Sequence, residues 1–232
     1  MSLTYTIILL ISLSYPLYRS FGSPLYFSKK FHALFPAIAI MAAIYLSWDV
    51  YFTNAGYWGF NSNYLLGLYI GNLPIEELFF FLIIPFSCMF IYEVLRYLLL
   101  DFSKKFDHQI IHILSMLVLF LVFITNLDKS YTRTAAIYAL IVLFITWVYR
   151  KDILPLFYLS FIFMLIPFIL VNGILTGAFI PEQLVWYNND ENLGIRLYTI
   201  PVEDIIYCFG MMLTVTSLYE YFLARKAMKP KL

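Results

Sequence analysis

Seven apolar segments fill most of this chain, and they constrain the fold more than any other feature of the sequence. A helix of about 20 apolar residues crosses the hydrocarbon core of a bilayer, and each segment approaches or exceeds that length. The predicted spans are residues 3–18, 32–53, 74–98, 108–126, 133–149, 153–175 and 200–223. We therefore expect an all-α integral membrane protein with about seven transmembrane helices.

The low charge content favours the same fold class. Only 12% of the 232 residues are charged and 62% are hydrophobic, whereas about 25% of the residues in a typical soluble domain are charged. So few charges cannot cover the surface of a water-soluble domain of this length. The formal net charge of +1 gives no reason to expect nucleic acid as a partner, so the expected surroundings are membrane lipids.

Basic residues are distributed unevenly between the two ends of the predicted spans. With seven spans, one side of the membrane receives 12 of the 15 lysines and arginines, and the other side receives only Lys129, Arg133 and Arg196. Cytoplasmic loops carry the excess of lysine and arginine. We therefore expect the N-terminus outside and the C-terminus in the cytoplasm, in a cytoplasmic membrane of the bacterial type.

The chain also contains an internal repeat. The sequence Pro-Ile-Glu-Glu at residues 74–77 recurs as Pro-Val-Glu-Asp at residues 201–204, an offset of 127 residues. The Tyr-Glu pair at residues 92–93 recurs at residues 219–220 with the same offset. Agreement at separated points indicates a duplicated unit rather than chance.

The repeat predicts how the spans are organised. Spans one to three correspond to spans five to seven, and the fourth span links the two units. Because three spans and a linker return the chain to its starting side, the repeats are expected to be parallel and related by an axis along the membrane normal. The predicted units are residues 1–100, a linker span at 101–127, and residues 128–232.

The duplicated motif brings four carboxyl groups to one depth in the membrane: Glu76, Glu77, Glu203 and Asp204. Acidic residues within membrane spans are costly and usually functional. Adjacent carboxyl groups in an apolar pocket cannot all ionise, so at least one is expected to keep its proton as a general acid. The structural alternative is that these carboxylates only favour the positive end of the helix dipole.

Two further polar residues are candidates for the same region. Asp49 ends the second span, and Asn172 is its counterpart at an offset of 123 residues. Both are interpreted as orienting the acidic cluster or binding substrate, with a position at the membrane interface as the alternative. Arg196 could pair with one of the acids, or remain an exposed loop arginine.

Aromatic residues near the acids are candidates for binding a cationic substrate state. Phe79, Phe80, Phe81 and Tyr207 could present ring faces to a cation, and Trp48, beside Asp49, is a further candidate for binding substrate. For most of the tryptophans and other aromatics, including Trp58 in the first long loop, a place in the aromatic belt at the membrane interface is favoured instead. The chain has no dinucleotide-binding glycine motif and only three histidines, so no cofactor or metal is expected.

These residues resemble the small membrane-bound carotenoid (lycopene) cyclases. The resemblance rests on four segments, which are Asn72–Glu77, Tyr198–Asp204, Trp58–Asn61 and Asn192–Leu197. In that family, two homologous polypeptides or two fused halves cyclise the ends of lycopene. This chain resembles the fused form over almost its whole length, although Trp58 and Gly59 have no clear counterpart in the second half.

The resemblance implies an intramolecular lyase, or isomerase, of the lycopene β-cyclase type. The implied reaction is an acid-catalysed, redox-neutral cyclisation of the ψ end groups of lycopene to ionone-type rings, giving β-carotene via γ-carotene. The lipophilic carotenoid would enter from the bilayer. Glu76 and Glu203 are the leading acid and base candidates, with Glu77 and Asp204 tuning their protonation. The alternative is a small SWEET-like transporter with parallel three-helix repeats.

Overall fold

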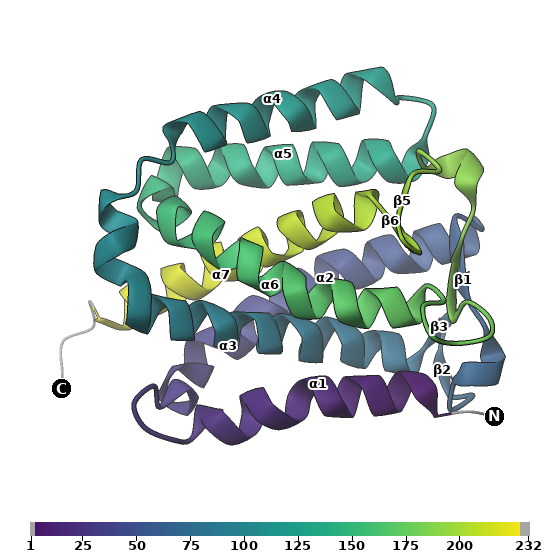
Figure 1. The fold of residues 1–232 in the computed structure, drawn as a ribbon, viewed down its shortest axis with the longest axis horizontal. Coiled ribbons are helices and arrows are strands. Elements are labelled where there is room, and N and C mark those ends of the chain that lie inside the picture. The colour runs from purple at the N-terminus through teal and green to yellow at the C-terminus, as the bar shows by residue number, and fades with distance from the viewer. Residues whose placement is uncertain (1–2, 228–232) are drawn as a thin grey trace.

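The computed structural model describes residues 3–227, and within them the chain forms seven α helices that run along one common axis (Figure 1). The helices are α1 (Thr4–Ser20), α2 (Phe31–Asn54), α3 (Ile75–Lys105), α4 (Gln109–Thr125), α5 (Ser130–Arg150), α6 (Leu154–Leu175) and α7 (Glu203–Ala227). Each predicted span overlaps one of these helices. The largest difference is at the end of α3, which continues to Lys105, because polar residues end an apolar span without ending a helix.

The apolar character of the helices makes this a helical membrane protein. Four helical segments among the described residues are long and apolar enough to cross a membrane, and they are Phe27–Asn54, Ile75–Lys105, Ser130–Leu175 and Glu203–Lys226. The third of these joins α5 and α6 through a short 3₁₀ turn. Gln109–Thr125 is a shorter apolar helix.

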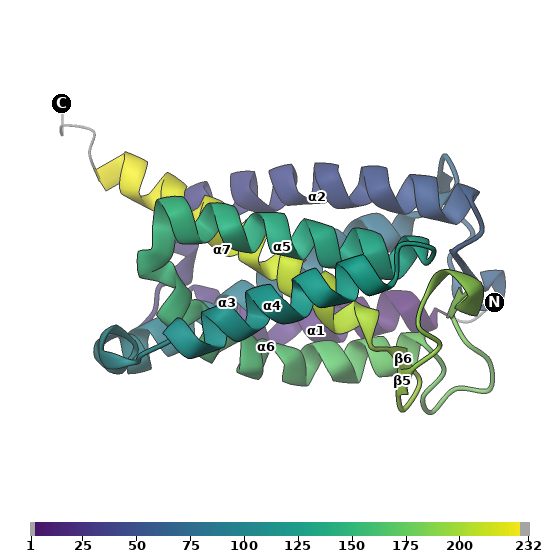
Figure 2. The ribbon, with the colours of Figure 1, turned by 90° about the horizontal axis from the view of Figure 1, so that it is seen from above.

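The internal repeat is visible in the way the helices pack. Helix α1 packs against α3, and α5 packs against α7 in the same manner. Helix α2 packs against α7, while its counterpart α6 packs against α3, so each half contributes a helix to the other. Helix α4 has no counterpart and lies on the outside of α5 (Figures 1 and 2).

Short strands in the two long loops cover one end of the bundle. Strand β1 (Trp58–Phe60) pairs antiparallel with β4 (Val185–Tyr187). The other four strands form two hairpins, β2 (Tyr69–Ile70) with β3 (Leu73–Pro74), and β5 (Arg196–Leu197) with β6 (Ile200–Pro201). All three pairs lie at the end of the bundle where α3 and α7 begin (Figure 1).

The two long loops are equivalent in position, although the Trp58-Gly59 pair itself does not recur in the second half. Asn61 caps a 3₁₀ turn by accepting the backbone N–H of Asn63 at 3.0 Å, and Asn188 does the same for Asp190 at 3.0 Å. This fixes the offset at 127 residues, so Gly59 corresponds to Trp186. The two residues face each other across the strand pair, and a side chain at residue 59 would collide with the indole ring.

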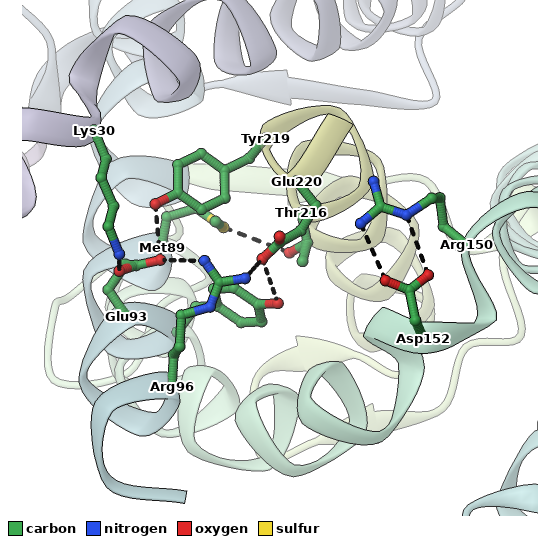
Figure 3. A network of polar contacts seen from close by, with 10 residues as sticks. Lys30, Met89, Glu93, Arg96, Arg150, Asp152, Thr216, Tyr219 and Glu220 are labelled. Carbon is green, nitrogen blue, oxygen red and sulfur yellow. Dashed lines mark hydrogen bonds and ion pairs between the residues drawn. The ribbon is translucent and has the colours of Figure 1, made fainter. Parts of the chain in front are cut away.

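A network of charges lies at the opposite end of the bundle, between α3 and α7 (Figure 3). Glu93 forms ion pairs with Lys30 and with Arg96, whose Nη1 lies 3.2 Å from Glu93 Oε1. The second terminal nitrogen of Arg96, Nη2, pairs with Glu220, the repeat counterpart of Glu93. Arg96 therefore joins the equivalent glutamates of the two halves.

Two tyrosines tie the halves together within this network. Tyr92 donates a hydrogen bond to Glu220 Oε1 at 2.9 Å, and Tyr219 donates one to Glu93 Oε1 at 2.7 Å. In each half, the tyrosine of the Tyr-Glu pair thus donates a hydrogen bond to the glutamate of the other half. The exchange of hydrogen bonds between the two halves is therefore reciprocal.

Candidate functional site

A buried cavity of about 40 Å³ lies at the strand-covered end of the bundle. Its walls come from the N-terminal parts of α1, α3, α5 and α7, the C-terminal parts of α2 and α6, and strands β1 and β4. The lining residues are Tyr5, Asp49, Trp58, Phe60, Glu77, Phe80, Tyr131, Phe168, Asn172, Leu175, Val185, Tyr187, Asp204 and Tyr207. Both halves of the chain therefore build one site.

Two repeat-related carboxyl groups face this cavity, each held by a tyrosine. Tyr5 donates a hydrogen bond to Glu77 Oε2 at 2.6 Å, and Tyr131 donates one to Asp204 Oδ1 at 2.5 Å. Each tyrosine is the second residue of the first helix in its half. Glu77 is 8% exposed and Asp204 is 2% exposed, so both carboxyl groups depend on protein donors rather than water.

The two carboxyl groups differ in their other partners. Asp204 Oδ2 accepts hydrogen bonds from Asn172 Nδ2 at 2.6 Å and from the Tyr187 hydroxyl at 3.1 Å. Asp204 therefore has three hydrogen-bond donors, and such donors favour the charged form of a carboxyl group relative to one with fewer donors. Tyr5 is the single side-chain donor to Glu77 among the hydrogen bonds of the described residues.

Asp49 gives the first half a second carboxyl group where the second half has Asn172. Its Oδ1 accepts a hydrogen bond from Trp58 Nε1 at 2.5 Å, while its Oδ2 is buried without a hydrogen-bond partner. Asp49 and Glu77 both line the cavity, and none of the lining residues in the described chain is a lysine or arginine. Two carboxyl groups in such a place cannot both ionise at low cost.

Tyr187 connects the site to the second long loop. Burial, and then the negative charge of Asp204, raise the pKa of the Tyr187 hydroxyl well above the ordinary tyrosine value, so it keeps its proton. The Arg196 guanidinium lies over the Tyr187 ring, 5.5 Å from its centroid. Arg196 donates hydrogen bonds to Thr199 O and to Asn189 Oδ1. It lies outside the cavity, and neither hydrogen bond goes to Glu77 or Asp204.

Glu76 and Glu203, the leading acid and base candidates from sequence, lie outside this cavity. Glu76 Oε1 accepts the backbone N–H of Leu66 at 2.6 Å, and Glu203 Oε1 accepts that of Leu193 at 2.7 Å. Successive helical side chains point about 100° apart around the axis, so only one of two adjacent acids can face the cavity. Of the four acids in the duplicated motif, Glu77 and Asp204 are therefore the two that line the cavity.

The candidate aromatic residues divide into two groups. Phe80 and Tyr207 line the cavity, whereas Trp48 lies behind it and packs on Tyr207 with ring centroids 5.0 Å apart. Trp58 is 5% exposed and packs on Tyr131 at 5.1 Å. The preference for placing Trp58 in the interfacial belt was wrong, because its indole N–H is needed by Asp49.

Three tyrosines of the site were missed from sequence. Tyr5 and Tyr131 could have been found from the internal repeat, because Tyr-Thr at residues 5–6 recurs at residues 131–132 with an offset of 126. Tyr187 carries none, since its role follows from the pairing of β1 with β4. Among residues 3–227, no group of three or more His, Cys, Asp or Glu side chains is arranged to hold a metal ion.

The fold and site define a helical membrane protein in which two repeats share a buried carboxyl-containing cavity. A family model described as lycopene cyclase matches residues 2–95 and 128–222, which lie in the first and the second half. The chain therefore belongs to the lycopene cyclase family, as a form that carries two repeats in one polypeptide. No curated protein and no solved structure matches the chain. The family implies a carotenoid cyclase and a carotenoid substrate.

Proposed function

We propose that this protein cyclises both ψ end groups of lycopene to ionone-type rings, giving β-carotene by way of γ-carotene. The observation that carries the proposal is the pair Glu77 and Asp204, which face one buried cavity in unequal hydrogen-bonding environments. A cyclisation of this kind needs one carboxyl group that gives a proton and one that takes a proton. It needs no oxidant and no metal.

The proposed arrangement in the membrane has all seven helices crossing it, as two parallel three-helix repeats joined by α4. The proposed units are residues 1–100, 101–127 and 128–232, with the N-terminus outside. The equivalent packing of α1 on α3 and of α5 on α7 supports the parallel repeats. Helices α1 and α4, which are the shortest, carry exposed apolar side chains such as Ile11 and Ile113, suited to lipid.

Ring formation would begin with protonation on the side of the first half. One of Asp49 and Glu77 retains a proton, because no cation lines the cavity to balance two negative charges. That proton is transferred to the terminal carbon–carbon double bond of the ψ end. A new C–H bond forms, and a tertiary carbocation remains on the neighbouring carbon.

Asp204 would complete the reaction as the base. The next suitably placed double bond of the substrate attacks the carbocation, which forms the C–C bond of the ring and moves the positive charge into the ring. Asp204 then removes a proton from an adjacent ring carbon, and the electron pair of that C–H bond becomes the ring double bond. One proton is gained and one is lost, so the product is an isomer of the substrate.

Aromatic side chains and the absence of water would protect the carbocation. Phe80, Trp58 and Tyr207 present rings at the cavity, and such rings attract a desolvated cation by about 2 kcal/mol. Water reaching the cavity would trap the cation as an alcohol. The short strands β1 and β4, which cover this end of the bundle, serve to exclude it.

The direct test is expression in a bacterium that accumulates lycopene, followed by chromatography of the extracted pigments. We expect lycopene to be replaced by γ-carotene and then by β-carotene. The absorption spectrum and the retention time identify the ring. Unchanged lycopene, with the protein present in the membrane at normal level, would reject the proposal and leave the transporter alternative.

Glu203, which lies outside the cavity, offers a prediction about stability rather than chemistry. Replacing Glu203 with Ala leaves the N–H of Leu193 and the buried hydroxyl of Thr132 without their acceptor, at a cost of about 1–3 kcal/mol. Glu203→Gln keeps a carbonyl acceptor, so it is expected to retain stability and ring formation. Denaturant unfolding of the purified variants measures the first effect. Equal stability of the Ala and Gln variants would contradict the anchoring role.

A further inference from the structure

An apolar groove outside the cavity lies between α1, α3 and α6. Its volume is about 280 Å³, and its lining includes Ile11, Ser12, Ile84 and Val171. Phe168 lines both the groove and the central cavity. It lies one helical turn before Asn172, so its side chain forms the wall between the two spaces.

The size of the central cavity makes a second binding region necessary. The cavity measures about 40 Å³, whereas a cavity that holds benzene measures roughly 150 Å³. The site must widen even to admit one end of an isoprenoid chain, and the rest of that chain must lie elsewhere. A second apolar groove, whose lining includes Leu66, Glu76 and Phe79, shares no lining residue with the cavity.

The repeat shows that this groove exists in only one half. By the offsets of 126 for α1 and 123 for α6, Tyr138 stands in place of Ser12 and Tyr45 in place of Phe168. These two tyrosines pack edge to face with centroids 5.2 Å apart. Gly210 leaves room for them, since a Cβ there would lie 2.9 Å from Tyr138 Cδ1. The equivalent space in the second half is therefore filled by side chains.

We propose that the groove between α1, α3 and α6 binds the polyene chain of the carotenoid, and that Phe168 moves aside to admit an end group to the cavity. This inference rests on the proposed function. Because the counterpart groove is filled, both ends of the substrate use the same entrance, one after the other. The monocyclic product must therefore leave the cavity and turn before the second ring is made.

The first test fills the groove with the side chain that the second half uses. Ser12→Tyr copies Tyr138, and it retains the backbone carbonyl that accepts the Ser87 hydroxyl at 2.9 Å. The larger side chain should displace the polyene and with it the end group that reacts in the cavity. We therefore expect Ser12→Tyr to lower ring formation by about tenfold or more. Ser14→Tyr is the matched control, since Ser14 lies on the same helix and is exposed, and it should change the rate by less than about twofold.

The second test does not depend on whether a large side chain is tolerated. Cysteine replaces Ser12 in one variant and Ser14 in another. In each purified variant, the rate at which an apolar maleimide labels the introduced thiol is measured with and without lycopene. Lycopene should slow labelling at residue 12 several-fold and leave residue 14 unchanged. Provided that the wild-type protein cyclises lycopene, either of two results would overturn the groove assignment. One is full activity of Ser12→Tyr, and the other is no protection of the thiol at residue 12. Failure of the wild-type protein to cyclise lycopene would instead reject the proposed function.

Discussion

Replacing Glu77 with Gln or Asp204 with Asn is expected to lower the rate of ring formation by about 10²–10⁴-fold, the range for loss of a positioned general acid or base. In Glu77→Gln, the amide oxygen can still accept the Tyr5 hydrogen bond, but the side chain cannot donate a proton to an alkene. Asp204→Asn keeps the shape of the donor cluster but cannot take a proton from the ring. The measurement is cyclised pigment formed per unit of protein in lycopene-containing membranes.

The neighbouring acids provide controls that differ only in the direction they face. Glu76→Gln and Glu203→Gln make the same chemical change one residue away, at side chains that lie outside the cavity. We expect both to stay within a few-fold of the wild-type rate. Loss of activity in these two variants, with full activity in Glu77→Gln and Asp204→Asn, would restore the assignment favoured from sequence.

The unequal roles proposed for Glu77 and Asp204 arise from small changes to a duplicated frame. Both halves place a tyrosine hydroxyl on the motif carboxyl group. The two halves differ in the second polar residue at the site, which is Asp49 in the first half and Asn172 in the second. An amide donates to Asp204 and supports its charge, whereas a second carboxyl group beside Glu77 favours a retained proton. One substitution in the repeat thus separates an acid from a base.

The sequence predicted the positions of the helices because these depend on local and periodic features. Apolar length located every helix, and the offset between the motifs placed Glu77 and Asp204 at the same depth. The offset also paired Asp49 with Asn172, and both residues line the cavity. In a duplicated chain, the offset between the repeats predicts which residues occupy equivalent positions in the fold.

The sequence could not decide which way adjacent side chains point. Glu76 and Glu77 look interchangeable in the motif, and the choice between them depends on where the loop backbone at Leu66 needs an acceptor. The burial of Trp58 and the contact of Arg196 with Tyr187 depend on the pairing of β1 with β4. That pairing joins residues more than a hundred positions apart, which no short pattern records.

The charge network at the other end of the bundle leads to the second large effect, which is on stability. Arg96 pairs with both Glu93 and Glu220, and the side chains of these glutamates are only 3% and 9% exposed. Arg96→Met would leave Glu220 with the Tyr92 hydroxyl but without its cation, while Glu93 would still have Lys30. Removing one partner of a buried ion pair costs about 3–5 kcal/mol.

Because the Arg96 side chain is itself 23% exposed, water can partly compensate, and we expect a loss at the lower end, about 3 kcal/mol. The measurement is the free energy of unfolding of the purified protein in mixed micelles. Lys104→Met is the control, since Lys104 and Asp101 form an exposed pair on the same helix that should contribute less than about 1 kcal/mol. Adding Glu220→Gln to Arg96→Met removes the unpaired charge, so the double variant should recover much of the lost stability. If Arg96→Met were no less stable than Lys104→Met, the network would not be what holds α3 to α7 at this end.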